Sequence, residues 1–129
     1  MSVTPFEMTG RVVGIKRDGT SEVIESHGPP VRLDGHTFGV ARIDRNPPHN
    51  GEMHPDGDEL LYLVSGSLDL VVEEGGTHDE VGEITRTRFS AGQGVLIPRG
   101  VWHKVEVLEP TELIHLTPGP GDGHRLLGR

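Results

Sequence analysis

The chain has 129 residues, a net charge of −8 and no cysteine. This length suits one domain. The acidic charge argues against a nucleic-acid partner, because phosphate contacts need clustered lysine and arginine, and the lack of cysteine excludes disulfides and thiolate metal sites. No apolar run approaches the ~20 residues of a membrane span, and the N-terminus lacks the features of a signal peptide. We therefore expect a soluble, cytoplasmic protein without a membrane partner.

Turn-forming residues divide the chain into short segments. The 19 glycines and 10 prolines are too many for a helical bundle, but they are typical of short strands joined by turns. Several runs between them alternate with period two, as Leu68, Leu70 and Val72 do, which indicates strands with one inward face. The predicted strands are 10–16, 21–26, 37–43, 59–64, 67–73, 84–89, 94–98, 102–108 and 112–117. This pattern predicts an all-β sandwich or barrel over residues 1–117.

The C-terminal segment differs from the rest of the chain. Residues 118–129 are rich in glycine and proline and carry few apolar side chains. Such a segment has too little apolar surface to offset the loss of conformational entropy on ordering. We therefore expect a flexible tail over residues 118–129.

The segment 52–59 combines turn-forming residues with three potential metal ligands. Glu52 and His54 are two residues apart, so their side chains leave the same face of an extended strand. Residues 55–57 then turn the chain, and Glu59 begins the next predicted strand. If the turn is a hairpin, Glu59 returns to the side of His54, and the three groups converge as a metal site requires.

A fourth candidate ligand follows a second turn, at Pro98 and Gly100. His103 begins a predicted strand whose inward face continues with Val105 and Val107. An imidazole at the head of an apolar face is an unusual use of a core position, because a buried polar group needs a partner. A bound ligand would supply that partner.

The two segments resemble the paired motifs of the cupin superfamily. Residues 54–66 reproduce the spacing His-x4-Glu-x6-Gly of the second half of the first motif. Residues 92–103 reproduce the second motif, Gly-x5-Pro-x-Gly-x2-His. Either spacing alone is weak evidence, but the pair is specific. Asn46 stands where the leading glycine is usual, and Val107 stands where the closing asparagine is usual.

This resemblance implies a single jelly-roll β-barrel that holds one divalent metal ion on Glu52, His54, Glu59 and His103. Glu52 departs from the family pattern, because it replaces the first histidine of a His-x-His pair. Two histidines and two carboxylates then replace three histidines and one glutamate, which favours Mn, Fe(II) or Ni over Cu; Zn stays open. His49 is an alternative ligand, although it lies three residues before Glu52 and so has the wrong parity for the same strand face.

The resemblance also implies a function. We expect a metal-dependent enzyme, an oxygenase, isomerase or lyase, that acts on a small oxygen-bearing organic molecule held in the barrel. Glu59 or Glu52, displaced from the metal, is the expected catalytic base. The alternatives are a non-catalytic barrel that binds or senses a small ligand, with or without metal, and a structural β-sandwich with coincidental histidines. Similar single-domain cupins pair through sheet edges, so we expect a homodimer.

Other side chains leave two interpretations open. Arg42 and His115 lie on predicted strands and either line the cavity or face solvent. Trp102 either forms a cavity wall or covers the barrel mouth or an interface. Tyr62 has the opposite parity to Glu59, so we expect it to face outward, in packing or a dimer contact. The histidines expected to be solvated are His27, His36, His78 and His124.

Overall fold

The computed structural model describes residues 2–28, 30–48, 50–77 and 80–127, which form strands and loops. The strands are β1 (Arg11–Lys16), β2 (Ser21–Glu25), β3 (Gly35–Ile43), β4 (Glu52–Met53), β5 (Glu59–Glu74), β6 (Glu83–Ser90), β7 (Gly94–Ile97), β8 (Trp102–Gly119) and β9 (Gly123–His124). The predicted all-β class is confirmed. Within the described ranges no helix is long and apolar enough to cross a membrane.

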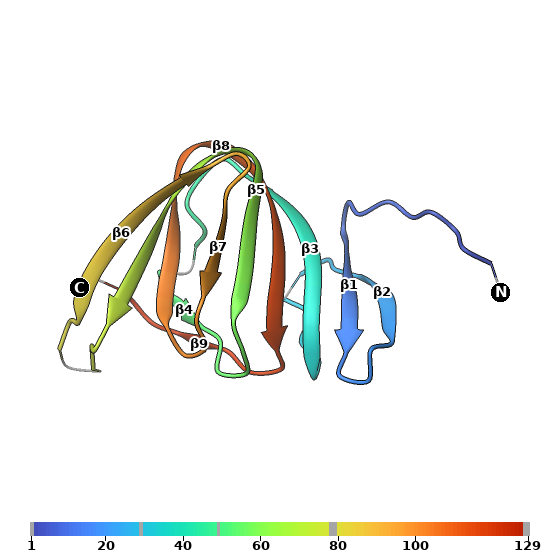
Figure 1. Cartoon of the computed structure of the whole chain (residues 1–129), viewed down its shortest axis with the longest axis horizontal. Coiled ribbons are helices and arrows are strands. Elements are labelled where there is room, and N and C mark those ends of the chain that lie inside the picture. Colours follow the sequence, from blue (N-terminus) through green and yellow to red (C-terminus); the bar gives the residue numbers. More distant parts are fainter. Residues whose placement is uncertain (1, 29, 49, 78–79, 128–129) are drawn as a thin grey trace.

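Two long strands organise the barrel. β5 pairs antiparallel with β6, β7 and β8, and β8 also pairs with β3 and β4. Both strands arch over the top of the molecule, with β6 on one side and β3, β1 and β2 on the other (Figure 1). Each long strand therefore contributes to both walls and links them.

The bend in β5 explains why the sequence predicts two strands there. The register between β5 and β8 shifts between Leu63 and Leu68. Gly66 lies in this stretch with a φ of 90°, a conformation that residues with a side chain rarely adopt. A Cβ at Gly66 would also collide with Thr111 Oγ1 of β8. The predicted strands 59–64 and 67–73 are thus one bent strand.

Alternating aliphatic side chains fill the closed end of the barrel. Leu63 and Leu68 are fully buried, and fully burying one leucine stabilises a fold by about 1.5–3 kcal/mol. Leu61 and Leu113 belong both to this core and to the wall of an internal cavity. The core cluster consists of Leu61, Leu63, Leu68, Leu70, Phe89, Ile97 and Leu113. The core therefore supports the cavity from one side.

The C-terminal segment differs from the expected flexible tail. β8 continues to Gly119, and β9 pairs with β4. Leu127 is buried, with 5% of its surface exposed. Arg125 donates a hydrogen bond to Glu73 Oε2 at 2.6 Å, and its guanidinium lies 4.4 Å from the centre of the Trp102 ring. The sequence did not predict these contacts of residues 118–127, because the partners come from distant strands.

Candidate metal centre

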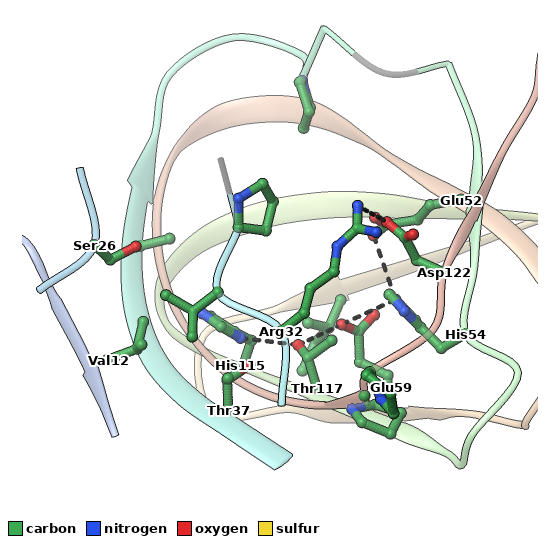
Figure 2. Close-up of a pocket in the computed structure, with 18 of the residues that line it drawn as sticks. Val12, Ser26, Arg32, Thr37, Glu52, His54, Glu59, His115, Thr117 and Asp122 are labelled. Carbon is green, nitrogen blue, oxygen red and sulfur yellow. Dashed lines mark hydrogen bonds and ion pairs between the residues drawn. The ribbon is translucent and has the colours of Figure 1, made fainter. Parts of the chain in front are cut away.

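A cavity of about 460 Å³ lies within the barrel. Its walls come from the inner faces of β3, β5 and β8, from residues 30–33 and from residues 117–122. Most of its wall is apolar, formed by Val12, Val31, Leu33, Ala41, Ile43, Leu61, Val105 and Leu113. Glu52, His54, Glu59 and His103 also line it, and we call these residues the four-residue centre. Figure 2 labels the first three of them.

Strand pairing brings the four-residue centre together. Glu52 of β4 pairs directly with His103 of β8, and Glu59 is the first residue of β5. The two motif loops are also joined, because Gly100 N donates to His54 O at 2.9 Å. Glu52, His54 and Glu59 lie close together across the turn between His54 and Glu59, and the β4–β8 pairing adds His103.

The spacing of the four side chains fits a metal ion. His103 Nε2 lies 3.2 Å from Glu59 Oε1 and 3.4 Å from Glu52 Oε1. His54 Nε2 lies 3.3 Å from Glu59 Oε2 and 3.7 Å from Glu52 Oε1. One nitrogen or oxygen atom from each residue lies within 4.8 Å of the other three. Bonds of about 2.0–2.2 Å to a central ion produce separations of this size between ligand atoms.

The histidine environments support the same interpretation. His103 Nδ1 lies 2.9 Å from Val101 O, so Nδ1 carries the proton and donates it to that carbonyl. Its Nε2 then faces the carboxylates of Glu52 and Glu59. Neither ring nitrogen of buried His54 has a hydrogen-bond partner within the described part of the chain. His54 Nε2 nevertheless lies in ion-pair range of the Glu59 and Glu52 carboxylates, so a cation between these residues would take the place of a proton on that nitrogen.

The charges of the four-residue centre are strongly coupled. Burial alone lowers the pKa of His54 and His103, but Glu52 and Glu59 outweigh it and raise these pKa values to about 10 and about 9. Burial alone raises the pKa of Glu59, but His103 and His54 lower it to about 2. The metal-free centre therefore holds two imidazolium ions beside its two carboxylates at neutral pH. A divalent cation that displaced both protons would leave the total charge unchanged.

Two features around the four-residue centre were missed from the sequence. Thr117 Oγ1 donates to Glu59 Oε2 at 2.7 Å, and His115 Nδ1 lies 2.9 Å from the same hydroxyl. Arg32 and Asp122, both lining the cavity, form an ion pair at 2.8 Å that joins the loop between β2 and β3 to the C-terminal segment (Figure 2). The alternation of β8 placed position 115 on one face with 117, but no motif indicated a role for either residue.

The remaining candidates divide clearly. His115 lines the cavity, whereas Arg42 is 82% exposed and pairs with Glu112. Trp102 does not line the cavity and instead stacks with Arg125. Tyr62 is exposed on the outer face, as its parity predicted.

The other histidines have varied surroundings. His27 is exposed beside Glu25. His124 is 49% exposed, lies 3.6 Å from Asp122 and also lines the cavity. His36 is half-buried, whereas His49 and His78 lie outside the described residues.

The two remaining departures from the family pattern contact each other. Asn46 Oδ1 accepts a hydrogen bond from Val107 N at 2.6 Å. Asn46 therefore ties the loop before β4 to β8, the strand that carries His103. This contact holds two parts of the chain together close to the four-residue centre.

Comparison with known proteins identifies the domain. Residues 44–117 match the family model for the cupin domain, and no curated protein matches the chain. A cupin-2 domain protein from Shewanella frigidimarina superposes with a TM-score of 0.52 at 20% identity, covering 74% of this chain and 85% of that one.

Two larger proteins show the same fold. Oxalate decarboxylase from Bacillus subtilis, which has Mn(II) centres, superposes with a TM-score of 0.54 at 19% identity, covering 70% of this chain and 24% of that one. Oxalate oxidase in complex with the substrate analogue glycolate gives a TM-score of 0.53 at 18% identity, covering 69% and 45%. The chain thus spans less than half the length of either enzyme. Similarity at this level establishes the jelly-roll fold and nothing further about activity.

Proposed function

Because the chain belongs to the cupin domain family, we propose that it is a metal-dependent cupin enzyme acting on a small oxygen-bearing organic molecule. The observation that carries this proposal is the four-residue centre, a set of two imidazoles and two carboxylates in the wall of a largely apolar cavity. A divalent ion bound there, Fe, Mn, Ni or Zn, would polarise an oxygen of the substrate. The reaction class is an oxygenation, an isomerisation or a lyase reaction.

The residues of this chain divide the work. The apolar walls exclude water and hold the hydrocarbon part of the substrate. Glu59 is 6% exposed and receives the Thr117 hydrogen bond, so it suits a fixed ligand. The Glu52 side chain is 24% exposed and is therefore better placed to exchange a proton with a substrate. We assign Glu52 the role of base and Glu59 the role of anchor.

We also propose a homodimer, formed through an apolar sheet face rather than an edge. Cross-strand partners share one face of a sheet. One row of such partners across β7, β5, β8, β3 and β1 consists of Leu96, Leu60, Leu116, Phe38 and Val13. Leu96 is 70% exposed, and Leu60 and Tyr62 are also exposed. A contiguous exposed apolar surface of this kind marks an interaction site, and a second copy would cover it.

Metal content tests the proposed function. Untagged protein, purified without added metal, is analysed by ICP-MS beside the variants His103→Ala and Glu52→Ala, with His36→Ala as a control outside the cavity. We expect about one equivalent in wild type and in His36→Ala, and loss in His103→Ala. Retention in Glu52→Ala would remove Glu52 from the ligand set.

The same preparation separates an enzyme from a binding module. If wild type holds no metal even after anaerobic incubation with Fe(II), Mn(II), Ni(II) and Zn(II), the metalloenzyme proposal is wrong. A metal-loaded protein that is stabilised by a small ligand but turns over no candidate substrate would instead be a ligand-binding cupin.

A further inference from the structure

His115 occupies an apolar wall of the cavity, away from the four-residue centre. Its ring points from β8 into the cavity, and Thr117 lies between it and Glu59 (Figure 2). Burial lowers the pKa of His115, although Glu59 and Glu52 oppose this effect. The ring is therefore neutral at neutral pH and carries one proton on one of its two nitrogens.

Counting protons fixes which nitrogen carries it. The hydroxyl of Thr117 has a single proton, and this proton is donated to Glu59 Oε2 at 2.7 Å. At the 2.9 Å contact with His115, Thr117 Oγ1 can therefore only accept, so Nδ1 of His115 is the donor. Nε2 is left with a lone pair, since the hydrogen bond that His115 makes within the described residues is the Nδ1 contact with Thr117.

The neighbouring strand β3 leaves room for this ring. Gly39 of β3 is the direct cross-strand partner of His115. A Cβ at Gly39 would collide with Nε2 and lie 3.1 Å from Cε1 of the ring. The φ angle of Gly39 is not positive, so backbone conformation does not require glycine at this position. Glycine is required at position 39 because a side chain there would occupy the space of the His115 imidazole.

We propose that His115 is a substrate-binding residue whose bare Nε2 accepts a hydrogen bond from a hydroxyl group of the substrate. Because the surrounding wall is apolar, the substrate class is a hydroxyl-bearing organic molecule with a hydrocarbon body and an oxygen that reaches the metal. Thr117 is a positioning residue, since it sets the tautomer of His115 and orients Glu59. This inference rests on the proposed function and specifies its substrate.

The tautomer is tested by nitrogen NMR on protein labelled with ¹⁵N-histidine. In wild type at neutral pH, with or without Zn(II), we expect a protonated Nδ1 and an unprotonated Nε2 on His115. Thr117→Ser should keep this tautomer, whereas Thr117→Val should give a mixture of the two neutral tautomers of His115. A protonated Nε2 in wild type, or an unchanged spectrum in Thr117→Val, would overturn the assignment. The metal-free spectrum stays decisive for His115 even if metal binding, and with it the proposed function, fails.

Binding to the Zn(II)-loaded protein tests the substrate class. The probes are two pairs that differ in one methyl group: 2-hydroxy-2-phenylacetate with its 2-methoxy analogue, and catechol with 2-methoxyphenol. For at least one pair, the hydroxyl compound should bind about 3- to 10-fold tighter to wild type, which is the worth of one hydrogen bond. In His115→Phe the two compounds of a pair should bind equally well. His115→Gln should keep part of the preference for the hydroxyl compound, and His36→Phe should keep all of it. The proposal would be overturned if His115→Phe kept the affinity ratio of wild type, or if no probe bound.

Discussion

Metal binding to the four-residue centre is expected to release protons, because the same nitrogens bind either a proton or the metal. Free histidine has a pKa of 6.5, whereas the neighbouring carboxylates raise the pKa of His54 to about 10 and that of His103 to about 9. Both rings are therefore charged in the metal-free protein at neutral pH. A metal ion binds only neutral imidazole, so each ion bound should displace about two protons.

The affinity for metal should rise with pH in two stages. Below about pH 9 both histidines must lose a proton, so the apparent association constant should rise about 100-fold per pH unit. Between the pKa values of His103, about 9, and His54, about 10, one proton is released, and the slope should fall to about 10-fold per unit. At higher pH the affinity should level off. Glu59, with its pKa of about 2, contributes nothing in this range.

Calorimetry in buffers of different ionisation enthalpy measures the number of protons released. Titration of Zn(II) or Ni(II) at neutral pH should give about two protons per ion in wild type and about one in His54→Ala. His36→Ala should match wild type. Release of less than one proton in wild type would refute the reasoning, since it would mean that the histidines are already neutral before metal binds.

Three further predictions concern the ligands, the C-terminal segment and the dimer. Glu52→His gives the site three histidines and one glutamate. After loading with equal Mn(II) and Ni(II), the ratio of bound Ni to bound Mn should rise by about 10-fold or more relative to wild type. An unchanged ratio would argue that Glu52 is not a ligand. Arg125→Met leaves Glu73 as a buried carboxylate without its cation, so urea unfolding should show a loss of about 3–5 kcal/mol. As a control, Arg86→Met removes the exposed ion pair of Arg86 with Glu106 and should cost less than about 1 kcal/mol. Equal losses would contradict a structural role for the buried pair. Leu60→Glu places a charge on the apolar face, so sedimentation velocity should show a monomer where wild type is a dimer; a monomeric wild type would contradict the proposed interface.

Three residues of the four-residue centre come from one short stretch of the chain, and the structure brings them together with His103. Glu52 and His54 are two residues apart and Glu59 follows after one turn, so three of the four positions depend on eight consecutive residues, although β4 itself ends at Met53. His103 lies far along the chain, but the glycine and proline spacing of its own turn places it at the start of a strand. Strand parity and turn-forming residues can both be recognised in the sequence without knowledge of the tertiary structure.

The features that were missed depend on contacts between distant segments. Arg125 meets Glu73 across 52 positions, and composition alone indicated a flexible segment there. Arg32 meets Asp122 across 90 positions, and neither residue belongs to a motif. Thr117 also had no motif, because hydroxyls on strands are common and its role follows only from the 58-residue separation that brings it to Glu59.

The proton count of the four-residue centre explains how this fold can exist before metal arrives. Two carboxylates in a buried site would repel each other strongly if both were charged and alone. The two imidazolium rings, with pKa values of about 10 and about 9, supply the same positive charge that a bound divalent cation would supply. A site of three histidines and one glutamate lacks this equality, since one carboxylate balances a single imidazolium. The second carboxylate, Glu52, therefore lets metal and protons exchange at constant charge.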